Sequence, residues 1–254
     1  MTRRISARRG GRASGRVPTF ASQIRAFGAH AHFHVRSGCT DSGGTSTWVD
    51  AISGYALTNS GGTRMTYSTS VAALNGRPGW TAVAASTQYL STANSTLAAI
   101  IDGAQAYSLY VVRKAATVTG STRIIVAGGS TTASEWMYHG HSVTNGAIVY
   151  SRRVVAGTTT TTGSVNSGTA IVLDTYVYDA ATISAWAGAS ASISAVANTR
   201  APTLNRVIVG ALMDTGALSN YFDGAVGDIV IFLAAHTTAQ RLYVTGLINA
   251  QFGM

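Results

Sequence analysis

Three histidines alternate along one short stretch near the N-terminus. His30, His32 and His34 are separated by Ala31 and Phe33, so on a β-strand all three imidazoles would project from one face. Neutral imidazole is a good ligand for zinc, nickel or copper. However, side chains in such a row stand about 7 Å apart, and the alternating stretch contains no carboxylate or thiol. We therefore expect a structural role, with a metal site as the alternative.

A second stretch contains side chains that could bind a ligand. It is SEWMYHGH, with Glu135, Trp136, Tyr138, His139 and His141. An aromatic ring beside a carboxylate can form a platform for a sugar, and the H-x-H pattern places two imidazoles on one strand face. These residues are candidate glycan or metal contacts, as are the three N-terminal histidines. The interpretation we prefer is a polar rim with Trp136 in the core.

Hydrolytic or redox chemistry has little support in the sequence. Glu135 is the single glutamate of the chain, whereas retaining glycoside hydrolysis needs two carboxyl groups about 5 Å apart. Two aspartates brought together by the fold are the alternative source of such a pair. The single cysteine, Cys39, is expected to be a semi-buried thiol, and no phosphate loop, zinc-finger spacing or dinucleotide fingerprint is present. We expect no enzyme activity, no catalytic residue and no cofactor.

The positive charge of the chain is concentrated at its start. Residues 1–36 hold eight of the 18 basic residues and no acidic residue, and residues 1–18 are rich in Arg, Gly and Ser. Such a segment is disordered on its own and gains a function from what it contacts. The candidate partners are nucleic-acid phosphates and neighbouring subunits of a virus shell. A solvated tail or a targeting sequence is the alternative. The predicted partner-binding arginines are Arg3, Arg4, Arg8, Arg9, Arg12 and Arg16.

The remaining chain is apolar and nearly neutral. Hydrophobic residues make up 46% of the sequence and charged residues only 11%. A surface this poor in charge is easier to explain if neighbouring subunits cover much of it. No apolar run reaches the roughly 18 residues that a membrane-spanning helix requires, so we expect no membrane partner.

Short β-rich segments separated by turn residues dominate the middle of the chain, which favours a sandwich over a fold with alternating strands and helices. The expected strands are 107–113, 123–127, 147–150, 170–178, 183–186 and 206–212. A further apolar strand is expected over 225–233. Beyond it, Thr237 and Gln240 have the spacing of a capping box, which predicts a final helix that buries Val244, Ile248 and Phe252.

Two motifs carry a resemblance to a known family. Trp48, Asp50, Ser53 and Gly54 form a W-x-D-x-x-S-G run, and LNGRP follows at 74–78. Together with the closing strand, where Asp228 stands in place of the family's usual glutamate, this pattern resembles concanavalin A-like, laminin-G-like jelly-roll domains of phage and bacterial surface structural proteins. The resemblance covers roughly residues 48–253 and implies an all-β, antiparallel sandwich with a short C-terminal helix.

These observations predict two parts, a basic N-terminal arm over 1–36 and a jelly-roll domain over 37–254. The predicted function is that of a structural virion protein, such as a capsid-associated or decoration protein of a tailed phage, located in the virion. The expected partners are other virion subunits in a homo-oligomer, with nucleic acid and surface glycans as further candidates. The alternatives are a small-virus coat protein whose arm binds packaged nucleic acid, and a glycan-binding lectin-like module.

Overall fold

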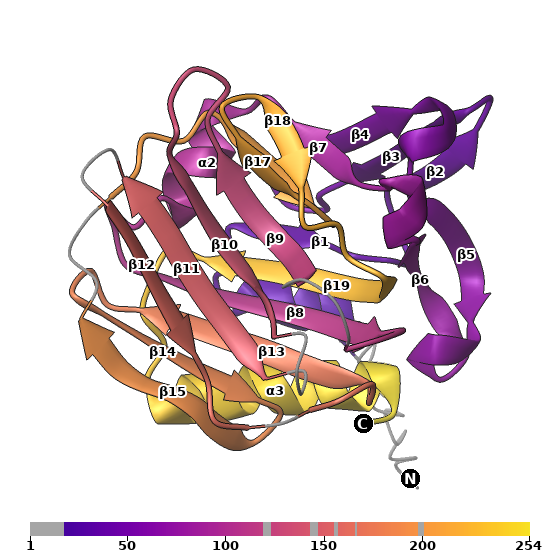
Figure 1. The fold of residues 1–254 in the computed structure, drawn as a ribbon. Helices are drawn as coiled ribbons and strands as arrows, with labels where there is room; N and C mark the ends of the chain where they lie inside the picture. The colour runs from indigo at the N-terminus through magenta and orange to yellow at the C-terminus, as the bar shows by residue number, and fades with distance from the viewer. Residues whose placement is uncertain (1–17, 119–122, 143–146, 155–156, 166, 198–200) are drawn as a thin grey trace, which may run out of the picture.

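A computed structural model describes residues 18–118, 123–142, 147–154, 157–165, 167–197 and 201–254. These residues form two stacked antiparallel sheets with short helices at their margins (Figure 1). The expected all-β sandwich with a C-terminal helix is therefore confirmed. None of the helices in the described ranges is long and apolar enough to cross a membrane.

The first sheet has eight strands. They are β1 (Ala31–Phe33), β5 (Thr66–Val71), β6 (Arg77–Ala82), β8 (Tyr107–Ala115), β13 (Val172–Tyr178), β14 (Thr182–Ala187), β15 (Ser190–Ala197) and β19 (Gly224–Phe232). Their order is β15-β14-β13-β8-β19-β6-β5, and β1 pairs with β19 beside this path. The central position of β19 explains its nearly continuous apolar sequence, because both of its faces are covered.

The second sheet has nine strands. They are β2 (Cys39–Ser42), β3 (Thr45–Val49), β4 (Ala56–Ser60), β7 (Leu90–Thr92), β9 (Arg123–Gly129), β10 (Trp136–His141), β11 (Ile148–Val154), β12 (Gly157–Thr162) and β16 (Arg206–Val209). Their order is β12-β11-β10-β9-β16-β7-β4-β3-β2. A two-stranded hairpin of β17 (Leu212–Asp214) and β18 (Ala217–Ser219) contacts β9 and β10.

Three α-helices and three short 3-10 helices complete the fold. They are α1 (Phe20–Ala26), α2 (Ser95–Ile101), α3 (Thr238–Phe252), η1 (Gly61–Thr63), η2 (Ala72–Leu74) and η3 (Ala84–Ser86). The expected capping box of α3 is confirmed. The Thr237 side chain accepts a hydrogen bond from the backbone N–H of Gln240, and the Gln240 side chain accepts one from the backbone N–H of Thr237. The apolar side of α3 is buried as expected, and Arg241 lies 4.3 Å from the ring centroid of Trp186 on β14.

The main core lies between the sheets and is rich in aromatic side chains. Trp48, Trp80 and Phe222 are fully buried. Within the segment predicted as an arm, residues 20–33 fold onto this body: α1 contacts α3, and β1 pairs with β19 from Ala31 to Phe33.

Candidate functional site

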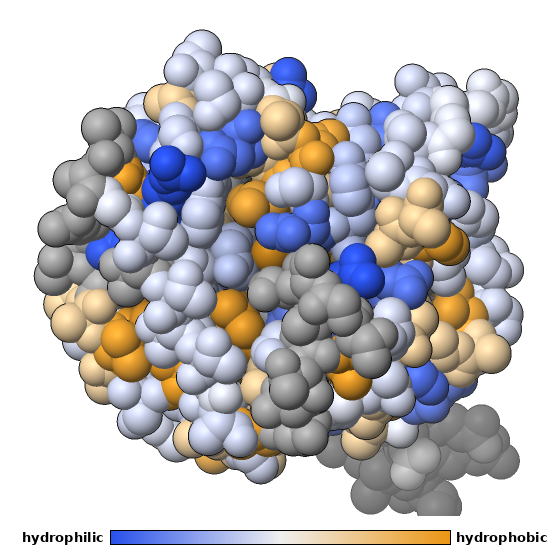
Figure 2. All heavy atoms as spheres, viewed as in Figure 1, coloured by the Kyte–Doolittle hydropathy of each residue, from blue (hydrophilic) through white to orange (hydrophobic). Residues whose placement is uncertain are grey.

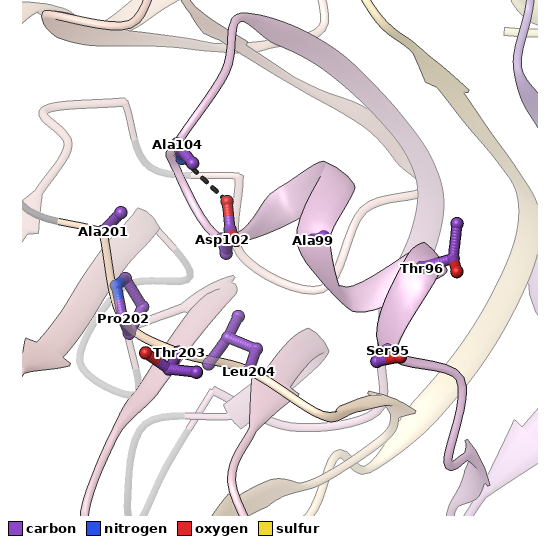
Figure 3. A pocket seen from close by; sticks show the side chains of 9 residues that line it. All are labelled: Ser95, Thr96, Ala99, Asp102, Ala104, Ala201, Pro202, Thr203 and Leu204. Carbon is purple, nitrogen blue, oxygen red and sulfur yellow. Dashed lines mark hydrogen bonds between the residues drawn. The ribbon is translucent and has the colours of Figure 1, made fainter.

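A cavity of about 660 Å³ lies between α2 and the segment that leads into β16 (Figure 3). Its volume falls in the range of about 300 to 1,000 Å³ that is usual for small-molecule sites. The lining residues are Ser95, Thr96, Ala99, Asp102, Ala104, Ala201, Pro202, Thr203 and Leu204.

The helical wall of this cavity begins at a side-chain cap and ends in a turn closed by Asp102. The Asn94 side chain accepts a hydrogen bond from the backbone N–H of Leu97 at 2.9 Å, which starts the helix. At the other end, Asp102 Oδ1 accepts the backbone N–H of Ala104 at 2.7 Å. The apolar side of α2, with Leu97 and Ile101, is buried, so Thr96 and Asp102 are left to line the cavity.

The opposite wall of the cavity, residues 201–204, is fixed in place by contacts with Glu135 and Gly128. Glu135 Oε2 accepts the backbone N–H of Thr203 at 2.6 Å. Leu204 is packed so closely on Gly128 of β9 that a Cβ there would overlap the leucine side chain. Glu135, predicted as a candidate ligand contact, therefore supports the wall and is absent from the lining.

Among the described residues that line the cavity, Asp102 is the one titratable group. Burial raises the pKa of this half-buried carboxyl above its ordinary value, and the hydrogen bond from Ala104 partly opposes the shift. The lining also includes the hydroxyl-bearing residues Ser95 and Thr96, at the other end of α2 from Asp102 (Figure 3), and Thr203 beside Pro202 and Leu204. This combination suits a ligand that carries hydroxyl groups on an apolar frame.

The remaining residues of the SEWMYHGH stretch separate onto two faces of β10. Trp136 and Tyr138 stack with ring centroids 5.3 Å apart and pack with Leu212 of the β17–β18 hairpin. Both rings are mostly buried, with 9% and 7% of their surface exposed. Figure 2 shows apolar surface in the upper middle of this view, with further apolar patches at its lower left and right.

His139 and His141 point into the space between the two sheets and are fully buried. His139 Nε2 lies 3.0 Å from the hydroxyl oxygen of Tyr107 on β8, and His141 Nδ1 donates to the carbonyl of Ser142 at 3.2 Å. Burial lowers the pKa of each imidazole to about 3. Neither ring lines the cavity or is open to a large ligand.

An ion pair lies in the same interior. Arg113 of β8 binds Asp174 of β13 with Nε to Oδ2 at 2.7 Å and Nη2 to Oδ1 at 3.3 Å, and both side chains are fully buried. Ser167 Oγ accepts a further bond from Arg113 at 2.9 Å. This charge pair bridges neighbouring strands within the first sheet.

The three N-terminal histidines do not act together. His30 lies 3.2 Å from the hydroxyl oxygen of Tyr55. His32 Nε2 and His34 Nδ1 instead both contact Asp228 Oδ2, at 3.1 Å and 2.9 Å. Asp228 was not predicted as their partner because 194 residues separate it from His34. The one signal for it in the sequence was its position in the closing strand, where the pattern that the chain resembles has a glutamate.

The predicted arm arginines, Arg3 to Arg16, lie outside the described residues. Arg25 of α1 donates to the carbonyl oxygen of Ala51. Cys39 is partly buried, and burial raises the pKa of its thiol to about 12, which favours the inert protonated form.

Comparison with known proteins shows that the fold of this chain is similar to that of several solved structures. No family model matches the chain, and no curated protein matches it. Domain 4 of AbnA, a GH43 extracellular arabinanase from Geobacillus stearothermophilus in complex with arabinotriose, is similar with a TM-score of 0.57 and 15% identity, over 87% of this chain and 98% of that one.

Two further solved structures show the same likeness. Trypanosoma rangeli sialidase in complex with the inhibitor DANA has a TM-score of 0.55 and 9% identity, over 85% of this chain and 32% of that one. The CBM40 of Ruminococcus gnavus IT-sialidase has a TM-score of 0.50 and 12% identity, over 58% of this chain and 86% of that one. The chain therefore has a β-sandwich fold shared with carbohydrate-binding domains.

Proposed function

We propose that this chain is a glycan-binding module and that the cavity between α2 and residues 201–204 holds the ligand. The observation that carries the proposal is the lining of this cavity, where hydroxyl groups and one carboxylate lie beside apolar surface. The likeness in fold to domain 4 of AbnA, whose structure holds arabinotriose, is consistent with it. This proposal favours the lectin-like alternative over the virion role.

The chemistry of the lining defines the ligand class. The Asp102 carboxylate accepts hydrogen bonds from sugar hydroxyl groups, and Thr96 and Thr203 can donate or accept. Pro202 and Leu204 offer apolar contact to the C–H faces of a sugar ring. Because the described lining residues include one carboxylate and no cationic side chain, they suit a neutral oligosaccharide better than an acidic one, and they suit binding better than hydrolysis by a carboxyl pair.

The test is calorimetric titration of the full chain with neutral oligosaccharides selected from a glycan array. Asp102→Asn keeps the shape and the acceptor for the Ala104 N–H but removes the charge. A hydrogen bond to a charged group contributes about 1.5 to 3 kcal/mol, so we expect affinity to fall about tenfold or more.

Asp223→Asn is the matched control, because Asp223 is also partly exposed and does not line this cavity. We expect this variant to bind glycans as the parent does. Absence of any glycan ligand, or equal affinity in the Asp102 and Asp223 variants, would refute the assignment.

The predicted role in a virus particle rests on the charge of the arm. Six arginines within residues 1–16, with no acidic residue among them, suit phosphate or acidic protein partners. Deletion of residues 1–18 should abolish salt-dependent nucleic-acid binding, measured by fluorescence anisotropy at several salt concentrations. The prediction would be contradicted if the chain without residues 1–18 bound nucleic acid with the same dependence of affinity on salt concentration as the full chain.

A further inference from the structure

Two imidazole nitrogens and one carboxylate oxygen converge where β1 meets β19. His32 Nε2 and His34 Nδ1 lie 3.1 Å and 2.9 Å from Asp228 Oδ2, and the three donor atoms all lie within 4.8 Å of one another. All three residues are buried, Asp228 completely.

The local backbone explains this convergence. Side chains alternate along β1 and into His34, the residue that follows it, so Phe33 packs on Trp48 in the core while His32 and His34 share the opposite face. The pairing of β19 with β8 shifts register between Val226 and Ile229. Such a bulge re-aims a side chain, and Asp228 lies within it.

The carboxylate is also oriented from its second oxygen. Asp228 Oδ1 accepts the backbone N–H of Val35 at 2.8 Å, which leaves Oδ2 directed at the two imidazoles. Phe20 of α1 covers the cluster, with ring centroids 5.4 Å from His32 and 5.6 Å from His34. A cavity of about 270 Å³, lined in part by Ser22, Arg25 and His32, adjoins it.

We propose that His32, His34 and Asp228 form a binding site for a divalent transition-metal ion. Ligand atoms about 2.0 to 2.2 Å from a tetrahedral zinc ion lie roughly 3.3 to 3.6 Å apart, so the two spacings from Asp228 Oδ2 have to widen slightly. The two imidazole nitrogens lie no more than 4.8 Å apart and have to close by up to about 1.4 Å to reach the same tetrahedral spacing.

The surroundings leave Asp228 Oδ2 to the two imidazoles. Within the described residues, the hydrogen-bond partners of Asp228 are His32, His34 and the Val35 N–H, and none of them is a lysine or arginine. A bound metal ion would replace the two hydrogen bonds between the imidazoles and Oδ2.

The donor set selects the class of ion. Two imidazole nitrogens with one carboxylate oxygen suit Zn²⁺, Co²⁺ or Ni²⁺, whereas Ca²⁺ and Mg²⁺ prefer oxygen ligands. Three protein ligands leave a fourth position for a water molecule. The bound ion would join the N-terminal segment to the central strand of the first sheet.

The experiment is a titration of the full chain with Co²⁺ after treatment with a chelator, followed by the visible absorption of the bound ion and by competition with Zn²⁺. We expect one equivalent of Co²⁺ with the spectrum of nitrogen and oxygen ligation, displaced by Zn²⁺, and a higher thermal unfolding midpoint with Zn²⁺. A chain that binds neither ion overturns the proposal and leaves a hydrogen-bonded cluster.

Two variants test the ligands. Asp228→Asn keeps an acceptor for the Val35 N–H, and its amide can donate to an imidazole nitrogen, but it removes the anionic ligand. His34→Ala removes a ligand at the more accessible edge of the cluster. We expect at least a tenfold loss of affinity in each, whereas His30→Ala, the matched control, should bind as the parent does. Unchanged binding in the first two variants, or equal loss in the control, overturns this ligand set.

Discussion

The buried histidines predict a steep loss of stability in mild acid. His139, His141 and His236 have pKa values lowered from 6.5 to about 3, about 3 and about 4, mainly because burial disfavours the charged imidazole. Below pH 6.5 the unfolded chain therefore binds protons that the folded protein does not. Because the unfolded state binds more protons, stability is fully present above pH 6.5 and is lost as the pH falls towards the folded pKa values.

The magnitude follows from proton linkage. Consider a histidine whose pKa is 6.5 in the unfolded chain and about 3 to 4 in the folded protein. Lowering the pH from 7 to 5 then reduces the free energy of unfolding by about 2 kcal/mol for each such residue. Three such residues cost about 6 kcal/mol together, which is comparable with the total stability of about 5 to 15 kcal/mol of a typical domain. Carboxyl groups with ordinary pKa values remain mostly ionised in this window.

Urea unfolding at pH 7 and pH 5 measures this loss. His141→Phe keeps an aromatic ring against Phe222, to which His141 is oriented edge to face, but cannot titrate, so the loss should fall by about 2 kcal/mol. Met137→Leu, on the same inward face of β10, is the control and should change stability without changing the pH dependence. The reasoning fails if the His141 variant loses as much stability as the parent between these pH values.

Two further predictions concern the fold. Asp174→Asn removes the partner of the buried Arg113 charge and should lower the free energy of unfolding by about 3 to 5 kcal/mol in urea titrations at pH 7; a loss under about 1 kcal/mol would contradict it. Thr237→Ala removes the capping box of α3 and should cost about 1 kcal/mol, and an unchanged urea midpoint would show that packing alone starts the helix.

Local patterns in the sequence predicted the elements because their causes are local. The alternation of His30, His32 and His34 predicted a strand with all three imidazoles on one face. The structure has β1 over Ala31–Phe33, and His32 and His34 meet, whereas His30 contacts Tyr55. The apolar run before Thr237 predicted a covered strand, which is β19. The spacing of Thr237 and Gln240 predicted the start of α3, because a capping box needs only four consecutive residues.

The candidate cavity could not be predicted in the same way. Thr96 and Asp102 come from one helix, whereas Thr203 belongs to a segment about a hundred residues later, and nothing in either stretch indicates the other. Glu135 had the chemistry of a ligand contact, but its bond to the Thr203 backbone gives it a supporting position. The sequence also did not determine that His139 points into the interior. The alternation of side chains along a strand assigns residues to two faces, but it does not indicate which face is buried.

The sequence by itself determined the class of fold, the closing strand and helix, and the concentration of positive charge at the N-terminus. Only the tertiary structure decided which polar groups meet: Asp228 with His32 and His34, and α2 with the segment before β16. The physical reason is that local conformation depends on neighbouring residues, whereas strand order, register and bulges bring distant side chains together. A bulge in β19 thus brought a carboxylate to two imidazoles that had none beside them in the sequence.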